Sequence, residues 1–528
     1  MSPTSAPPTG AHGKALVVLI AIGLAALVLP SAVRAADSIY WSDHLGAKIS
    51  RANLDGSGGG DDLGIGGVNL AGPSGIAIDP VMDRIYWAEE IGQISYANLD
   101  GTGRGILNTA GALVSQPSGI AIDTVLGKLY WANFEGDTIS YANLNGTGGG
   151  ELDTAGATVS APTGIAIDLD SHRVYWANSL TSTISYASLS GGNGGELDTA
   201  GAIVNHPAGV AIDLGRVDGD AIDPNRGRIY WTNGEATEGL FYANLDGSGA
   251  GEISTEGAEM SSPSGLAIDP DAGRIYWANR GLPGTISFAN LNGTGGGGEL
   301  ATAGATAEDP DFLALLEAPS GSGAPTISGR RQIERPLYCN QGSWKSDLLG
   351  AFLYRTPQSY AYSWLRNGET IAGATESTYR PRKPGIYDCR VTASNHAGTT
   401  AQTSADLALA RGFAYARRFA PVHGRRALVR LTCIGDGRCK GLVKLIAHVG
   451  YKRVIHRGGQ REVIRRRALF PIGKSRFSIY PGRTKVVRVK LKRKGARMLR
   501  NRRRHRLWVK LLGRVVDHRS LLLKAGPS

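Results

Sequence analysis

A pair of adjacent aromatic residues, Tyr-Trp, recurs six times at a nearly constant spacing in this 528-residue sequence. The steps between successive pairs are 46, 44, 45, 55 and 46 residues, and this period is typical of a four-stranded propeller blade. The residues of the six pairs are Tyr40, Trp41, Tyr86, Trp87, Tyr130, Trp131, Tyr175, Trp176, Tyr230, Trp231, Tyr276 and Trp277. We therefore predict an all-β chain that begins with a six-bladed β-propeller.

The segments around each pair have the composition of strands. Five repeats carry Pro-x-Gly followed by four residues that end in Asp, and all six continue after the aromatic pair into a run such as Ile-Ser-Tyr-Ala-Asn. These runs are short, apolar and bounded by Gly, Pro, Asn and Asp, which favours strands over helices. The small residues of the first segment, such as Gly75 and Ala77, suit the crowded axis of a ring. Turns such as Asp100-Gly101 and Asn145-Gly146 predict hairpins that need positive φ angles.

The two ends of the repeat array predict how the ring closes. The first pair, at Tyr40, has no Pro-x-Gly segment before it, whereas Pro310–Leu316 follows the last repeat and keeps the same frame, with Phe312 in place of Gly and Leu316 in place of Asp. We predict that this segment is the innermost strand of the first blade, which leaves no free sheet edge. The long step of 55 residues is explained by an insertion at 214–223.

The aromatic pairs extend into a four-residue motif, with Tyr-Trp-Ser-Asp ending at Asp43 and Tyr-Trp-Thr-Asn ending at Asn233. With the preceding Gly-Ile-Ala-Ile-Asp, this motif resembles the YWTD repeats of low-density-lipoprotein-receptor propellers, the class B repeats. The resemblance covers about residues 37–317 and implies a six-bladed propeller, which we place at 37–318. The fourth motif residue, Asp in that family, is here Asp43, Glu89, Asn133, Asn178, Asn233 and Asn279. The cysteine-rich modules of those receptors are missing from this sequence, so the resemblance does not carry a receptor function with it.

Residues 1–36 have the composition of a signal peptide. One lysine, Lys14, precedes an apolar run of 15 residues, which is followed by Pro30 and by a cleavage site after Ala35 or Ala36. An uncleaved membrane anchor is the alternative, and the short run argues against it. We expect a mature chain without a transmembrane segment, secreted or held at the extracellular face of the cell envelope.

Two further domains are predicted after the propeller. A Pro-, Ser- and Gly-rich linker at 319–324 precedes residues 325–410, where Cys339, Trp364, Tyr387 and Cys389 resemble the pattern of an immunoglobulin-type sandwich with a tyrosine corner. Residues 411–528 hold 35 Lys and Arg but three acids, and they resemble the small basic β domains of secreted actinobacterial proteins.

The basic domain shows its own secondary-structure pattern. Apolar and basic residues alternate from Val487 to Leu491, which predicts a half-buried strand. We predict a hairpin between 428–432 and 442–446, a short helix at 495–504 and a strand at 506–512. Four cysteines can pair in three ways, and sequence order favours the disulfides Cys339–Cys389 and Cys433–Cys439. Export from the cytosol would allow both disulfides to form. A metal site on the second pair lacks further ligands at suitable spacing.

Repeated carboxylates are the most prominent candidates for chemistry. They are Asp79, Asp123, Asp168, Asp213 and Asp269. Catalysis needs unequal groups, so we interpret this repetition as one structural hydrogen bond per blade, and an axial calcium or magnesium ion held by some of them is the alternative. The sequence carries none of the phosphate-loop or hydrolase motifs that we sought, and we assign no catalytic residue, cofactor residue or metal ligand.

A specific site on a pseudo-symmetric ring is expected where the repeats differ. The loops after the Tyr-Trp strand and those before the Pro-x-Gly strand should share one face, and solvated loop tips are the alternative interpretation. The candidate rim residues are His44, Glu90, Phe134, Glu135, Leu180, Asn205, His206, Glu235, Glu238 and Arg280.

These patterns favour an exported, non-enzymatic binding or scaffold protein. The rim would bind a protein or a glycan, and the basic domain would associate with anionic envelope polymers or headgroups. One alternative is a propeller lyase or hydrolase with an axial site. Another is an extracellular binder of polyanions or nucleic acid; export and the lack of interleaved aromatic residues argue against nucleic acid.

Overall fold

The computed structural model describes residues 37–66, 70–217, 221–222, 227–234, 237–457, 460–500, 506–512 and 520–525. Nearly every element in these ranges is a strand, and the helices among them are η1 (Leu349–Ala351) and α1 (Arg493–Arg500). None of the described helices has the length and apolar composition needed to cross a bilayer. The predicted signal peptide, residues 1–36, lies outside the described residues. The all-β fold class is confirmed.

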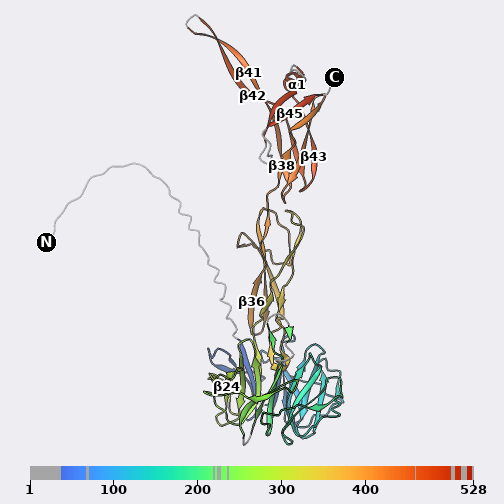
Figure 1. Cartoon of the computed structure of the whole chain (residues 1–528), viewed down its shortest axis with the longest axis vertical. Coiled ribbons are helices and arrows are strands. Elements are labelled where there is room, and N and C mark those ends of the chain that lie inside the picture. Colours follow the sequence, from blue (N-terminus) through green and yellow to red (C-terminus); the bar gives the residue numbers. More distant parts are fainter. Residues whose placement is uncertain are drawn as a thin grey trace, which may run out of the picture. The chain divides into compact units, whose positions relative to one another are not determined.

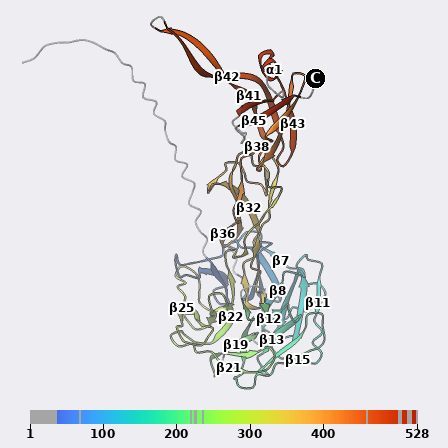
Figure 2. The same cartoon turned by 45° about the horizontal axis from the view of Figure 1, so that its top comes forward.

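The described residues contain the six blades of a propeller, five of them four-stranded sheets and blade 1 a sheet with a fifth strand. We number the blades 1 to 6 in the order of their Tyr-Trp strands (Figures 1 and 2). The innermost strands of blades 1 to 6 are β26 (Pro310–Leu316), β4 (Pro73–Asp79), β8 (Pro117–Asp123), β12 (Pro162–Asp168), β16 (Pro207–Asp213) and β22 (Pro263–Asp269). The Tyr-Trp strands are β1 (Ser38–Asp43), β5 (Arg84–Glu89), β9 (Lys128–Asn133), β13 (Arg173–Asn178), β19 (Arg228–Asn233) and β23 (Arg274–Asn279).

The outer half of each blade is built in the same order. The third strands are β2 (Lys48–Asn53), β6 (Gln93–Asn98), β10 (Thr138–Asn143), β14 (Thr183–Ser188), β20 (Gly239–Asn244) and β24 (Thr285–Asn290). The outermost strands are β3 (Gly60–Asp62), β7 (Gly105–Ile106), β11 (Gly149–Glu151), β15 (Gly195–Glu196), β21 (Ala250–Glu252) and β25 (Gly298–Glu299). The insertion in blade 5 contains the two-stranded pair β17 (Arg216–Val217) and β18 (Ala221–Ile222).

Blade 1 is completed by the far end of the repeat array, as predicted. Strand β26 pairs antiparallel with β1, with Tyr40 opposite Ala314 and Trp41 opposite Leu313. All seven residues of β26 are buried. The ring is therefore closed by strand pairing between the two ends of the array.

The innermost strands approach one another closely around the axis. A Cβ added at Gly75 would lie 2.3 Å from the carbonyl oxygen of Ser118, and one at Gly119 would lie 2.7 Å from that of Thr163. Any side chain at these glycines would collide with the backbone of the next blade, which confirms the crowding expected from the sequence.

Residues 321–409 form smaller β-sheets, except that β31 joins the sheet of blade 1. Their elements are β27 (Gly321–Gly323), β28 (Ile327–Gly329), β29 (Leu337–Cys339), β30 (Ser343–Trp344), η1, β31 (Leu353–Tyr354), β32 (Ser359–Arg366), β33 (Glu369–Thr370), β34 (Thr378–Tyr379), β35 (Gly385–Asn395), β36 (Gly398–Thr403) and β37 (Leu407–Leu409). The Cys339–Cys389 disulfide is present beside a fully buried Trp364, and Tyr387 donates its hydroxyl hydrogen to the carbonyl oxygen of Lys383 at 2.7 Å. The immunoglobulin-type assignment requires these features and stays a prediction.

The basic domain is one sheet with a helix. Its strands are β38 (Phe413–Ala416), β39 (Phe419–His423), β40 (Arg426–Ile434), β41 (Cys439–Arg457), β42 (Gln460–Ile479), β43 (Thr484–Lys490), β44 (Arg506–Leu512) and β45 (Ser520–Ala525). The predicted strands at β43 and β44 and the Cys433–Cys439 disulfide are confirmed. The helix predicted at 495–504 is confirmed as far as Arg500, and residues 501–504 lie outside the described residues. The predicted hairpin is wrong: β40 pairs with β43, β38 and β39, while β41 pairs with β42 and β44, so the disulfide joins two strands that do not pair with each other.

Candidate functional site

The backbone of the predicted rim is the same in all six blades. The first residue after each Tyr-Trp strand donates its N–H to the carbonyl oxygen of the residue before the innermost strand, at 3.0 to 3.2 Å. In blades 1 to 6 the donor residues are His44, Glu90, Phe134, Ser179, Gly234 and Arg280. Six equivalent positions thus carry six different residues, so any specific chemistry on this rim depends on which residue each blade supplies.

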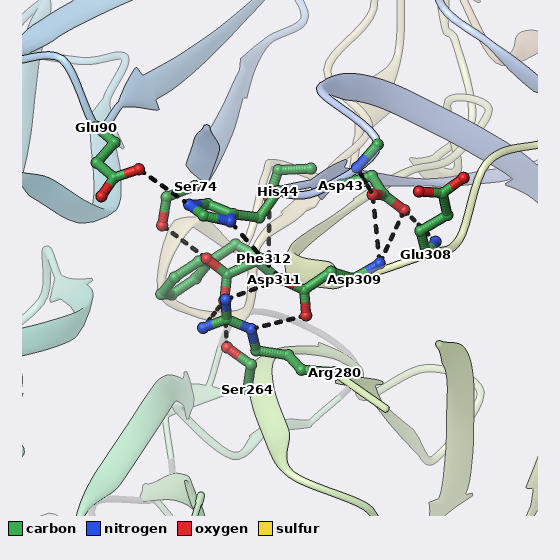
Figure 3. Close-up of polar contacts among 12 residues, drawn as sticks. Asp43, His44, Ser74, Glu90, Ser264, Arg280, Glu308, Asp309, Asp311 and Phe312 are labelled. Carbon is green, nitrogen blue, oxygen red and sulfur yellow. Dashed lines mark hydrogen bonds and ion pairs between the residues drawn. The ribbon is translucent and has the colours of Figure 1, made fainter. Parts of the chain in front are cut away.

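Four charged or titratable side chains meet across blades 6, 1 and 2, and we call them the polar arc: Arg280, Asp309, His44 and Glu90. Arg280 donates from Nε and Nη2 to the two carboxylate oxygens of Asp309 at 3.1 and 3.0 Å. His44 lies between two acids, with Nδ1 3.7 Å from Asp309 and Nε2 3.4 Å from Glu90 (Figure 3). The polar arc is therefore continuous over three neighbouring blades.

A buried carboxylate, Asp311, lies beneath the arc at the start of β26. It accepts hydrogen bonds from the hydroxyls of Ser74, at 2.7 Å, and Ser264, which belong to the two neighbouring blades. Its Oδ1 lies 3.9 Å from Nη1 of Arg280 (Figure 3). The charge of Asp311, together with the hydrogen bond to Asp309, raises the pKa of the Arg280 guanidinium, so this residue stays a cation at any physiological pH.

Asp311 marks a difference between the repeats at the axis. The other blades carry Ser74, Ser118, Thr163, Ala208 and Ser264 at the equivalent position after the proline. A single carboxylate in a ring of small, mostly hydroxyl-bearing side chains makes blade 1 chemically distinct from the other five. It also extends the polar arc inward toward the axis.

The loop that carries Asp309 is held by the fourth motif residue of blade 1. Asp43 Oδ2 accepts the N–H groups of Glu308, at 2.6 Å, and Asp309, at 3.3 Å. Burial raises the pKa of the Asp43 carboxyl, and these N–H donors act in the opposite direction. The carboxylate thus fixes the backbone that presents Asp309 to Arg280.

The residues that replace aspartate at this motif position make the same kind of contact. Asn133 Oδ1 accepts the N–H of Ser115 at 2.9 Å, and Asn178, Asn233 and Asn279 each accept an N–H from the corresponding loop. In blade 2, Glu89 accepts the N–H of Ala71 at 3.3 Å. An amide oxygen therefore holds the loop as a carboxylate does, and this position is structural.

The other rim residues proposed from the sequence are distributed around the remaining blades. Asn205 donates to the Thr237 hydroxyl and contacts His206 through its Oδ1 at 2.9 Å, while Glu238 accepts the N–H of Ser262. Phe134, Glu135 and Leu180 are exposed or partly exposed, and Glu235 lies outside the described residues. The structure thus brings His44, Glu90 and Arg280 together and leaves the others apart from this group.

The sequence interpretation missed Asp309 and Asp311. Asp311 belongs to the segment that closes the ring, and Asp309 directly precedes it. The sequence pattern of this segment indicates a strand and gives no sign of a site. Asp311 could have been recognised from the sequence, because the other five repeats have Ser, Thr or Ala at the equivalent position.

The repeated aspartates at the opposite ends of the innermost strands have the structural role that we expected. Asp79 Oδ1 accepts the N–H groups of Val81 and Met82, both at 3.0 Å, and Asp123, Asp168, Asp213 and Asp269 accept N–H groups of their own turns. Among the described residues, no group of three or more His, Cys, Asp or Glu is arranged to hold a metal ion.

Residues 349–354, which we call the plug, fill the ring at this opposite end. Helix η1 packs against β8, β12, β16 and β22, and β31 pairs in parallel with β26, with Leu315 opposite Leu353. All six plug residues are buried, and a Cβ at Gly350 would lie 2.6 Å from the carbonyl oxygen of Ile167. The polar arc and the plug therefore occupy opposite ends of the innermost strands.

Comparisons with protein-family models and with curated proteins gave no match. Among solved structures, one of a nidogen/laminin complex is similar at 16% identity and a TM-score of 0.42, covering 53% of this chain and 97% of that one. A gluconolactonase from Xanthomonas campestris is similar at 18% identity and a TM-score of 0.35, covering 46% and 79%. A putative 6-phosphogluconolactonase from Bacteroides fragilis gives 14% identity and a TM-score of 0.37, covering 55% and 100%. At such identities the likeness concerns the propeller fold alone, and we take no functional argument from it.

Proposed function

We propose that this chain is an exported, non-enzymatic binding protein whose propeller binds a glycan at the polar arc. The observation that carries this proposal is the asymmetry of a repeated rim. Blades 6, 1 and 2 place Arg280, His44 and Glu90 at equivalent positions, where blades 4 and 5 place Ser179 and Gly234. Backbone closure needs none of these charged side chains, because Gly234 makes the same backbone hydrogen bond.

The chemistry of the arc favours a neutral, hydroxyl-rich ligand. Arg280 is already paired with Asp309 and lies close to Asp311, and His44 is placed between two acids, so a charged ligand would compete with these existing pairs. A sugar hydroxyl can donate to a carboxylate and accept from a guanidinium at the same time. Phe134 stands at the equivalent rim position of blade 3 and is 38% exposed, so the rim also offers an apolar surface, and ligand sites commonly combine apolar and polar groups.

The proposal predicts that glycan binding depends on the arc and not on the rest of the rim. On an array of immobilised glycans, we expect binding by the secreted chain to fall at least tenfold in Glu90→Gln and His44→Ala, since a lost hydrogen bond to a charged group costs about 1.5–3 kcal/mol. The matched control is Ser179→Ala, at the equivalent position of blade 4, which should bind as the unaltered chain does. Binding of no glycan, or equal binding by all variants, would contradict the proposal, and a protein ligand would then be the alternative.

The remaining domains complete this proposal. We assign the propeller to the YWTD type and residues 325–410 to the immunoglobulin-like type, as further surfaces for interaction. The two disulfides are typical of a protein that matures in an oxidising compartment, which supports export. The basic domain, with 35 Lys and Arg against three acids, would hold the protein at anionic polymers or headgroups of the envelope.

A lyase or hydrolase is the second candidate function, and one observation favours it. His44 lies between two carboxylates next to a buried Asp311 and Arg280, and such unequal groups are what acid–base catalysis requires. If the protein is an enzyme of this type, we expect it to hydrolyse a sugar lactone, and the release of protons by the acid product measures the rate. This rate should fall at least a hundredfold in His44→Gln. No turnover above the uncatalysed rate would remove this candidate.

A further inference from the structure

The hairpin β41–β42 continues beyond the sheet to which it belongs. Strand β41 pairs with β44 from Lys444 to Ala447, and its pairing with β42 runs on for ten more residues, to Arg457 opposite Gln460. In the described part of the domain, no third strand pairs with this extension, which projects beyond the neighbouring strands in both views (Figures 1 and 2). We call residues 448–457 and 460–469 the basic ribbon.

The basic ribbon is a two-stranded extension with a large excess of positive charge. It contains seven Lys and Arg and a single acid, Glu462. The register places Lys452 opposite Arg465, and like charges at opposed positions destabilise a strand pair. An isolated two-stranded hairpin is itself marginal in water. A ribbon with this sequence therefore gains stability from an anionic partner.

Exposed aliphatic residues lie between these cations. Val454 and Val463 face each other in the register and are 41% and 48% exposed, and Leu469 is 60% exposed. Because side chains alternate along a strand, the register puts these three residues on one face of the ribbon. The pairs Lys452–Arg465 and His456–Arg461 lie two residues away on either side of the valine pair, at positions of the same face.

This arrangement distinguishes between two kinds of anionic partner. A soluble polyanion binds through charge and gains nothing from exposed valines. The headgroup region of an anionic bilayer offers phosphate to Lys and Arg and, a few ångströms deeper, an apolar layer to aliphatic side chains. We propose that the basic ribbon docks on an anionic lipid surface and inserts its Val454–Val463 pair between the headgroups. This proposal rests on the envelope association proposed above and names its lipid partner.

The test separates the apolar contribution from the electrostatic one. In Val454→Thr/Val463→Thr the charge, side-chain shape and strand propensity are retained while the apolar contact is weakened. We expect this double variant of the secreted full chain to bind phosphatidylglycerol-containing vesicles about tenfold more weakly in a flotation assay, as the loss of two buried methyl groups implies. Retention on heparin should stay unchanged. Val486→Thr, at a residue of the same domain that is 45% exposed, is the matched control and should bind vesicles normally.

The other outcomes separate the failure of this inference from the failure of the function on which it rests. Equal vesicle binding by the double variant and the unaltered chain overturns insertion by the ribbon and leaves association with the envelope standing. Binding to heparin but not to phosphatidylglycerol vesicles overturns the lipid partner in favour of a soluble polyanion. Binding to neither overturns both the inference and the proposed role of the basic domain.

Discussion

Replacing Leu315 by alanine is expected to lower the free energy of unfolding by about 2–5 kcal/mol, because it leaves a cavity in a packed core. Leu315 is fully buried in the strand that closes the ring. It stands opposite Ile39 in β1 and opposite Leu353 of the plug, and its N–H donates to the carbonyl oxygen of Phe352 at 2.8 Å. The substitution therefore weakens ring closure and plug docking together. Chemical denaturation followed by tryptophan fluorescence measures the change, since Trp41 lies in the sheet affected.

The matched control for this prediction is Leu126→Ala. Leu126 lies in a blade turn and is 57% exposed, so the same truncation there should change the unfolding free energy by less than about 0.5 kcal/mol. If Leu315→Ala were no more destabilising than Leu126→Ala, the closing strand would not contribute to the stability of the ring. That result would contradict the ring closure derived from the repeat pattern.

The ring could be predicted from the sequence because its physical cause is periodic. Each blade must bury both faces of its sheet against its neighbours, so the same apolar segments return at the same spacing. The segment Pro310–Leu316 could be assigned because it kept the frame of the missing strand, although Phe312 and Leu316 departed from the pattern. Such agreement among many local signals is what specifies a fold.

The plug could not be predicted in this way because it occurs once. Residues 349–354 form an apolar run inside a domain of short strands, and nothing in their spacing relates them to a propeller more than thirty residues earlier in the sequence. The run was nevertheless a signal: six consecutive apolar or small residues need a partner to bury them. The innermost strands of the propeller provide that partner.

The predicted hairpin at Cys433 failed for a different reason. Two apolar runs separated by Gly435, Asp436 and Gly437 match the pattern of paired strands, and a disulfide between the runs is compatible with that pairing. In the structure β43 pairs with β40 instead, and the short covalent loop fixes only the ends of the two strands. A disulfide constrains distance and does not determine which strands pair.

Only part of the candidate site could be predicted from the sequence, because only some of its residues lie where the repeats visibly differ. His44, Glu90 and Arg280 lie in the loops that vary between blades, where a specific site on a repeated ring is expected. Asp309 and Asp311 lie in the closing segment, and only the contacts with Arg280 show that they belong to the same group. The contact between blades 6 and 1 at the closure of the ring thus also assembles half of the polar arc.

Replacing Arg355 by methionine is expected to destabilise the chain by about 3–5 kcal/mol above pH 8, since it removes one partner from a buried ionic contact. The Arg355 side chain is 5% exposed, donates from Nη1 to Asp271 and lies 3.8 Å from Glu317. Burial raises the pKa of the Glu317 carboxyl to about 8, Asp269 acts in the same direction, and Arg355 opposes both. Without Arg355 this pKa rises further, so ionising Glu317 costs more.

The pH dependence gives this prediction its direction. Because folding raises the pKa of Glu317 above the ordinary glutamate value, the stability contributed by its protonated form is complete below that value and is lost as the pH rises through about 8. The unfolding free energy of the unaltered chain should therefore decline between roughly pH 5 and pH 8, and Glu317→Gln should flatten this decline because glutamine does not ionise. The loss of unfolding free energy caused by Arg355→Met should be smaller at pH 5 than at pH 9. At pH 9 it should also be smaller when Arg355→Met is introduced into the Glu317→Gln variant. A loss from Arg355→Met that is equal at both pH values would show that Arg355 stabilises the chain through Asp271 or by packing rather than by holding the charge of Glu317.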